Sequence, residues 1–348
     1  MYESATENAA TGDAQPQAGL NAAALRAISE ISCLPVLDCD EEVFLLFTER
    51  SGAGWEHNRD VNQKAAILEL EINDIAQRRV HQLSFHQNRG LLGARGTTGS
   101  VVWDSSICLA RFLAQHAAHA LPLQGRRCIE LGSGCGVGGV ACAQLGAHVC
   151  LTDQETLLPL IRKNVQENGL PLHDSVSEWQ VTHLESSTPT VHTKARRRRG
   201  DLARNPPPRQ GPAKAAAVMG SVCVTELMWG EPLAHYLPVS NDDAADHDDA
   251  ATKNLRWDYI IASDCAYNEH IVPAFVNTLA TLAGETTLVV LAQELRSDLV
   301  HACLLEHLLQ TFNVWRVLQD ADASDGQEAD GARRSCVVLY LAVLRVVV

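Results

Sequence analysis

The sequence lacks the features that mark disulfide-rich, membrane-spanning and repeat proteins. No two of its 11 cysteines have CxxC spacing, and their number is odd, which argues against a zinc site or a disulfide framework. The longest late apolar stretch, Val337 to Leu344, is too short to cross a bilayer. The sequence shows no internal repeat of about 20 to 50 residues, so we do not expect a solenoid. We therefore expect reduced core thiols, no bound metal and a soluble protein.

Basic residues are also in short supply. The chain has 28 Lys and Arg residues against 42 Asp and Glu residues, a net charge of −14 at pH 7. This balance argues against broad contact with a phosphate backbone and is compatible with a basic protein partner. The first 20 residues lack the apolar segment of a secretory signal. We expect a cytoplasmic protein, with the nucleus as a second compartment.

A glycine-rich segment between residues 126 and 153 organises the chain. The apolar run Cys128 to Leu131 leads into GSGCGVGG, a small-residue helix pattern continues to Leu145, and a second apolar run ends at Asp153. This order predicts a strand, turn, helix and parallel strand. Glycines let a backbone approach a ligand closely, and Asp153 can accept hydrogen bonds from a ribose. We predict a nucleoside cofactor pocket at the carboxyl edge of the sheet.

Two glycine patterns overlap in this turn. Gly132, Gly134 and Gly136 follow Glu130 with the spacing that is usual for S-adenosylmethionine-dependent methyltransferases. The alternative set of Gly134, Gly136 and Gly139 fits the dinucleotide fingerprint equally well. The turn alone does not decide between the two cofactors.

The rest of the chain alternates strand and helix patterns. A helix pattern follows Trp103, with Asp104 or Ser105 as its N-cap. Two consecutive strand patterns close the chain, at residues 313–318 and 335–344. Alternating strands and helices predict an α/β, Rossmann-like fold, in which the sheet is mostly parallel with one antiparallel strand near its end.

The N-terminal quarter has a different character. We interpret residues 1–22 as a flexible tail and residues 23–95 as an N-terminal extension that packs on the core. Within the extension, residues 42–49 and 66–72 have the apolar content of strands.

The main domain is predicted over residues 96–348, with two insertions. Residues 186–217 contain a run of four arginines and three successive prolines without an apolar period, which predicts a disordered basic insert. Residues 241–250 are acidic, and we expect them to form a loop. We expect contact with nucleic acid only through the basic insert.

Five segments, in this order, resemble the family 16 lysine methyltransferases, the seven-strand group with a DxxY signature. They read TGSVVWDSS, ELGSGCGVGG, LTD, VTELMWG and ASDCAY. The late segments LAQELRS and FNVWRV resemble most the ribosomal lysine N-methyltransferase 5 branch. The resemblance covers about residues 65–345. It implies a seven-stranded Rossmann-like methyltransferase sheet and S-adenosyl-L-methionine as the cofactor.

The resemblance also assigns roles to single residues. The residues implied in cofactor binding are Trp103, Gly132, Ser133, Gly134, Asp153, Trp229 and Ser263. Asp264 and Tyr267 match the DxxY motif, and the resemblance places them beside the substrate lysine as the catalytic pair. Where the family usually has an acidic residue before Trp229, this chain has Met228. We leave Met228 out of the predicted site.

The implied function is S-adenosyl-L-methionine-dependent protein-lysine N-methylation by a monomer. The implied substrate is a protein of the large ribosomal subunit or another translation component. Two alternatives stay open at this point. One is an NAD(P)-dependent oxidoreductase, from the second glycine pattern. The other is a non-catalytic module that binds the cofactor and docks on ribosomes.

Overall fold

The computed structural model describes residues 22–49, 61–93, 98–180, 219–237, 257–318 and 336–345. The predicted tail, apart from Ala22, lies outside the described residues, and so do the basic insert and the acidic loop. The flexibility of the tail, the disorder of the basic insert and the acidic loop therefore stay predictions. No described helix is long and apolar enough to cross a membrane.

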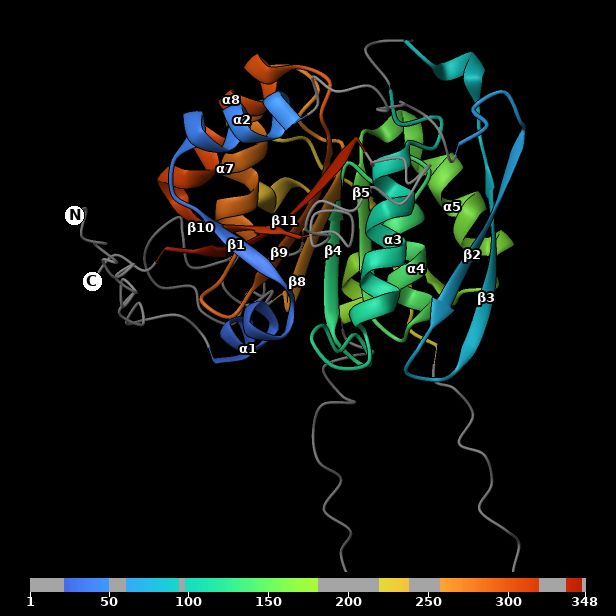
Figure 1. The fold of residues 1–348 in the computed structure, drawn as a ribbon. Helices are drawn as coiled ribbons and strands as arrows, with labels where there is room; N and C mark the ends of the chain where they lie inside the picture. Colours follow the sequence, from blue (N-terminus) through green and yellow to red (C-terminus); the bar gives the residue numbers. More distant parts are fainter. Residues whose placement is uncertain are drawn as a thin grey trace, which may run out of the picture.

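A nine-stranded sheet forms the centre of the molecule (Figure 1), in the order β1-β10-β11-β9-β8-β4-β5-β7-β6. The five central parallel strands are β4 (Arg127–Leu131), β5 (His148–Asp153), β7 (Val222–Glu226), β8 (Tyr259–Ser263) and β9 (Leu288–Glu294). Beyond β9, β11 (Val337–Leu344) runs antiparallel to both β9 and β10 (Phe312–Val317). This confirms the predicted mostly parallel sheet with an antiparallel strand near the end of the chain.

Two short edge strands extend the seven-stranded core. On one side β1 (Cys33–Val36), from the N-terminal part of the chain, pairs antiparallel with β10. On the other side the two-residue β6 (Leu172–His173) pairs parallel with β7. The carboxyl ends of β4, β5, β7 and β8 thus share one edge of the sheet, where ligands bind in open α/β folds.

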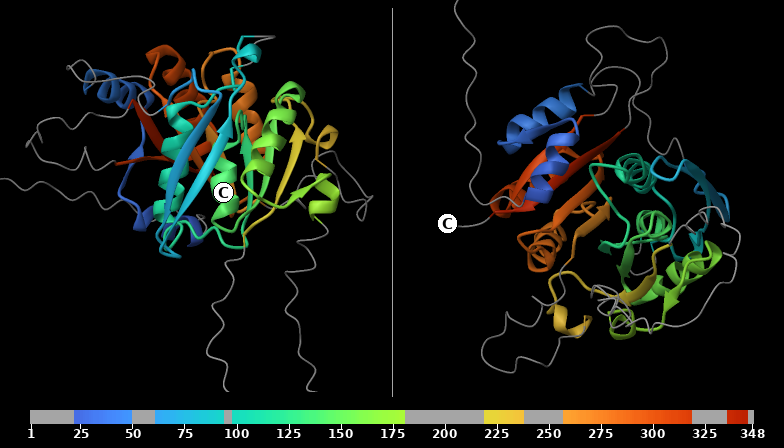
Figure 2. Two further views of the ribbon diagram at one scale, coloured as in Figure 1. Left: turned by 90° about the vertical axis from the view of Figure 1, so that its right-hand side faces the viewer. Right: turned by 90° about the horizontal axis from the view of Figure 1, so that it is seen from below.

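Helices cover both faces of the sheet (Figures 1 and 2). One face carries α3 (Asp104–His116), α4 (Val137–Gln144) and α5 (Leu158–Glu167); the other carries α2 (Cys39–Glu49), α7 (Val272–Leu282) and α8 (Asp298–Thr311). Successive side chains along a strand point to alternate faces of the sheet. Cys128 packs with the first set of helices and Ile129 with the second. Strands that are buried on both faces are uniformly apolar, which explains the unbroken hydrophobic runs.

A hairpin from the N-terminal part of the chain lies outside the main sheet. Its strands are β2 (Ile67–Asp74) and β3 (Arg79–His86), and β2 alternates exposed and buried residues. The hairpin packs against α3 and α5. Asn164 of α5 accepts a hydrogen bond from the His86 N–H at 2.8 Å, and Asn168 bonds the backbone of Ser84 in both directions. Helix α1 (Ala22–Glu30) lies apart from the hairpin (Figure 1) and buries Ala24 and Ala27 in the same apolar cluster as α3.

The strand predicted at residues 42–49 is wrong, because this segment belongs to helix α2. Three acidic residues occupy the first turn of α2, where their negative charges interact favourably with the positive end of the helix dipole and stabilise the helix. Asp38 also accepts a hydrogen bond from the Glu41 N–H at 2.8 Å. The apolar residues of α2 pack on α8 rather than on a neighbouring strand.

The predicted cap of α3 is also wrong. The helix begins at Asp104, so Trp103 is its N-cap residue and neither Asp104 nor Ser105 caps it. Ser106 instead donates from its hydroxyl to the Trp103 carbonyl at 2.7 Å. Three short 3-10 turns also lie among the described residues: η1 (Arg89–Leu91), η3 (Glu155–Leu157) and η4 (Leu233–His235).

Candidate active site

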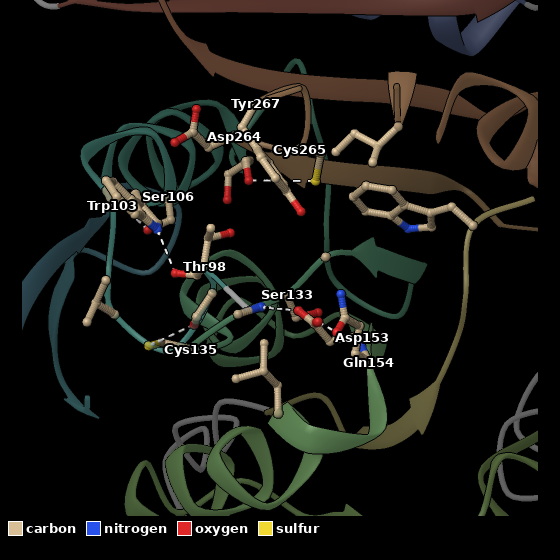
Figure 3. Close-up of a pocket in the computed structure, with 18 of the residues that line it drawn as sticks. Thr98, Trp103, Ser106, Ser133, Cys135, Asp153, Gln154, Asp264, Cys265 and Tyr267 are labelled. Atoms are coloured by element: carbon tan, nitrogen blue, oxygen red, sulfur yellow. Dashed lines mark hydrogen bonds between the residues drawn. The ribbon is translucent and has the colours of Figure 1, made fainter. Parts of the chain in front are cut away.

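A cavity of about 260 Å³ opens at the carboxyl edge of β4, β5, β7 and β8 (Figure 3). It brings together segments that lie more than 150 residues apart in the chain, from Thr98 to Ala274. All nine predicted site residues line it: Trp103, Gly132, Ser133, Gly134, Asp153, Trp229, Ser263, Asp264 and Tyr267. Their roles remain predictions, but the sheet topology places them around one space.

The glycine-rich turn forms the floor of this cavity. Gly132 and Gly134 both have left-handed backbone conformations, with φ of 60° and 57°, which residues with a side chain rarely adopt. A methyl group on Gly132 would lie 2.9 Å from Cys265 Sγ and 3.0 Å from Trp229. A methyl group on Gly134 would lie 2.9 Å from the carbonyl oxygen of Gly99. The backbone at Gly99 therefore crosses the glycine turn in direct contact with Gly134. Glycine is therefore required at both positions by conformation and by space.

Gly139, from the alternative glycine pattern, has a different task. A methyl group there would lie 2.1 Å from Leu151 and 2.9 Å from the Glu130 carboxylate. The Gly139 N–H donates to Glu130 at 3.1 Å. Gly139 therefore lets α4 pack closely on the strands, away from the cavity lining. Burial raises the pKa of Glu130 to about 8.

Asp153 ends β5 and is tied to the glycine turn. One carboxylate oxygen accepts the Gly134 N–H at 2.7 Å, and the other accepts the Gln154 N–H at 2.7 Å. Each oxygen has a further lone pair, so the carboxylate can still accept hydrogen bonds from a ligand diol. Burial raises its pKa to about 6, and the two backbone donors limit that rise by favouring the ionised form.

Ser133 connects the turn to the neighbouring strand. Its hydroxyl donates to the Glu130 carbonyl at 3.3 Å and accepts the Thr152 N–H at 3.0 Å, while its own N–H donates to the Thr152 carbonyl at 2.9 Å. Since the hydroxyl is engaged with backbone groups, Ser133 holds the first turn of the site in shape.

Two tryptophans stand on different walls of the cavity. Trp229 follows β7, and its ring centroid lies 4.9 Å from that of Phe275. Trp103 lies at the start of α3 and donates from its indole nitrogen to the Thr98 carbonyl at 3.2 Å. The Arg296 guanidinium lies over the Trp103 ring, 4.7 Å from its centroid, within the range of a cation–π contact.

The DxxY residues follow β8 as one loop. Ser263 ends the strand, and Asp264 has a left-handed φ of 57°, a rare conformation outside glycine. Burial raises the pKa of Asp264, and the adjacent Arg296 opposes that rise. Tyr267 is 41% exposed. It therefore reaches both the cavity and the surface, and burial also raises its pKa.

The sequence interpretation missed several lining residues. They are Thr98, Gln154, Leu227, Met228, Cys265, His270 and Ile271. Met228 lines the cavity although it departs from the family pattern. His270 and Ile271 follow Tyr267 closely in the chain and precede α7, so proximity to the DxxY motif could have indicated them.

The donor set suits a nucleoside sulfonium. The glycine floor leaves room for a ligand against the backbone, Asp153 can bind a ribose diol, and Trp229 offers a flat aromatic surface. Among the described residues, no group of His, Cys, Asp and Glu side chains is arranged to hold a metal ion.

Comparison with known proteins identifies the family. The family model described as lysine methyltransferase matches residues 81–195 and 213–302, more than half of the chain. The protein N-lysine methyltransferase METTL21A of Danio rerio is 30% identical over 241 residues, covering 69% of this chain and 79% of that protein. The EEF1A lysine methyltransferase 3 of Xenopus tropicalis is 37% identical over 76 residues, covering 22% of this chain and 33% of that protein.

A third comparison concerns a solved structure. The T. Thermophilus 16S rRNA N2 G1207 methyltransferase, in complex with AdoMet and guanosine, aligns with 81% of this chain and 51% of its own, with a TM-score of 0.38 and 15% identity.

The family match decides between the two glycine patterns. It spans the glycine turn, the Trp229 segment and the DxxY loop. The methyltransferase interpretation of the glycine pattern is therefore confirmed, and the oxidoreductase alternative is rejected. The chain therefore belongs to the lysine methyltransferase family, and it is an S-adenosyl-L-methionine-dependent protein-lysine N-methyltransferase.

Proposed function

We propose that this enzyme methylates a lysine of a large-subunit ribosomal protein or of another translation component. The late segments LAQELRS and FNVWRV support the ribosomal branch by resemblance. A relative named for EEF1A, a translation factor, supports the wider class. The net charge of −14 favours a basic protein such as a ribosomal protein. We further propose that the enzyme acts as a monomer in the cytoplasm, with the nucleus as a second compartment.

The observation that carries the proposed methylation of a lysine in this cavity is the position of the DxxY loop. Asp264 and Tyr267 line the same cavity as the glycine turn and Asp153. Tyr267 is also partly exposed. A lysine side chain can therefore enter past Tyr267, while the nucleoside half of the cofactor lies against the glycine turn.

The chemistry requires a neutral amine in line with the transferred methyl group. A bound S-adenosylmethionine supplies an electrophilic methyl on a positively charged sulfur. Presenting a free lysine, with a pKa of about 10.4, as the neutral amine at pH 7 costs roughly 4 to 5 kcal/mol before the site contributes. Burial in the cavity and nearby positive charge both reduce that cost. The protein's main contribution is then to orient the amine, with Asp264 as a hydrogen-bond acceptor and Tyr267 as a wall of the channel.

The test is a labelling experiment with defined fractions. Purified enzyme and tritiated S-adenosylmethionine are incubated with large ribosomal subunits, small subunits and ribosome-free extract, each from cells that lack the enzyme. The proposal expects one labelled protein, in the large subunits or among soluble translation factors, and its loss with Asp264→Ala. A labelled protein that has no part in translation would refute the substrate class.

A further inference from the structure

Arg296 is a charged residue that contacts two cavity-lining residues, Asp264 and Trp103, and the sequence interpretation did not identify it. It lies two residues beyond β9, and its Nη1 pairs with Asp264 Oδ2 at 2.6 Å. Its Nη2 pairs with the Glu294 carboxylate, and its guanidinium packs over the Trp103 ring. The Arg296 side chain is 34% exposed, whereas those of Asp264 and Glu294 are 6% and 1% exposed. One cation thus joins two buried carboxylates and a wall of the cavity.

The DxxY loop is clamped to the end of β9 around this cation. The Asp264 N–H donates to the Ala292 carbonyl at 2.8 Å. Gln293 donates to Asp264 Oδ1 at 3.1 Å and bonds Ala266 in both directions, accepting from its N–H and donating to its carbonyl. Both oxygens of Asp264 therefore have partners among residues 293–296. The left-handed conformation of Asp264 is held by these contacts.

A carboxylate at this place presents a problem for methyl transfer. An ionised, unpaired Asp264 would attract the substrate ammonium and raise its pKa, so the amine would be held in its unreactive form. The titratable groups that face Asp264 are Arg296 and Glu294 from the end of β9 and the Cys265 thiol from its own loop, which burial keeps neutral by raising its pKa. Of these groups, only Arg296 is positive.

We propose that Arg296 is a positioning residue for methyl transfer: it holds Asp264 in an ion pair and offsets its charge, so that the entering lysine can lose its proton. Asp264 then orients the amine through a lone pair without retaining the ammonium. The same guanidinium also packs on Trp103, a predicted cofactor-binding residue, so that the position of the acceptor Asp264 is coupled to that of a residue on the cofactor side. This inference rests on the proposed lysine methylation.

The kinetic test compares Arg296→Gln, Arg296→Lys and Glu294→Gln. With the labelled substrate identified as above, kcat of Arg296→Gln is expected to fall about tenfold at pH 8 and to recover by about pH 10, with KM unchanged or lower. Arg296→Lys keeps the charge and should restore the wild-type pH profile. Glu294→Gln removes the negative charge that pairs with the same guanidinium. The pH dependence of kcat in this variant should therefore match that of wild type or move to lower pH. An equal loss of kcat at every pH in Arg296→Gln would overturn the proposal.

A second measurement needs no substrate. The melting temperatures of wild type, Asp264→Asn, Arg296→Gln and the double variant are measured at pH 5.5 and pH 8. Together they form a double-mutant cycle, which gives the coupling between the two side chains. The proposal expects Arg296→Gln to lower the midpoint by about 3 °C or more at pH 8 in the wild-type background. The loss should be clearly smaller in the Asp264→Asn background. The coupling should be smaller at pH 5.5 than at pH 8, because burial raises the pKa of Asp264 and a protonated carboxyl forms no ion pair. Additive effects at both pH values would overturn the ion pair. A wild type that labels no protein would instead refute the proposed function, and the melting cycle would still decide the role of Arg296 toward Asp264.

Discussion

The contact between Gly134 and Gly99 predicts a specific defect for Gly134→Ala. The alanine must adopt a φ near the observed 57°, which costs roughly 1 to 2 kcal/mol. Its methyl group would also lie 2.9 Å from the Gly99 carbonyl oxygen and 3.2 Å from the Gly99 Cα. These neighbours are backbone atoms that cannot turn away, and such overpacking costs about 1 to 3 kcal/mol more. We expect a total loss of stability of about 2 to 5 kcal/mol.

Gly169→Ala is the matched control for this prediction. Gly169 has a similar φ of 65°, and a methyl group there meets nothing within 4 Å. Gly169→Ala should therefore lower the free energy of unfolding only by the cost of the backbone conformation, about 1 to 2 kcal/mol. Urea unfolding measures both losses, and calorimetry with S-adenosylhomocysteine measures binding. Binding should weaken at least about tenfold in Gly134→Ala, because the turn moves, and stay unchanged in Gly169→Ala. If the two variants lose equal stability and bind alike, the close crossing does not shape the site.

Three further perturbations test other parts of the structure. Trp229→Ala should weaken S-adenosylhomocysteine binding roughly tenfold to a hundredfold through lost aromatic contact, measured by calorimetry; unchanged binding would remove Trp229 from the cofactor site. Glu42→Ala leaves the buried Arg316, its partner at 2.9 Å, without that carboxylate, and should cost about 3 to 5 kcal/mol in urea unfolding; a loss below about 1 kcal/mol would contradict this. Burial raises the folded-state pKa of Glu130 to about 8 and of Asp153 to about 6, so the ligand-free protein should lose stability as pH rises from about 4 to about 8. In thermal melts, Glu130→Gln should flatten the part of this fall above about pH 6, and an unchanged slope would contradict the buried carboxyl.

The sequence was sufficient to predict the cavity where local pattern and sheet topology agree. The glycine turn, Asp153 and Trp229 each follow an apolar strand, and parallel strands place their carboxyl ends on one edge. By that reasoning the glycine turn and Asp153 were assigned to one pocket before its geometry was known, whereas Trp229 was assigned to the same pocket by the family resemblance.

Arg296 was missed because its role depends on strand register. Its contact with Asp264 arises because Ser263 pairs with Ala292 across β8 and β9, which places the residues after both strands side by side. Helix α2 was missed for a different reason. Its run Val43 to Phe47 is apolar at every position, so it shows no helical period, although the acidic residues before it are a helix-start signal.

The most direct measurement is the chemical identity of the methylated product. Purified enzyme is incubated with tritiated S-adenosylmethionine and extract from cells that lack it, and the labelled material is hydrolysed in acid and separated by amino-acid type. The account predicts that the label elutes as methyllysine and is lost in Asp264→Ala. Label in nucleic acid or in another amino acid, or equal label in Asp264→Ala, would contradict it.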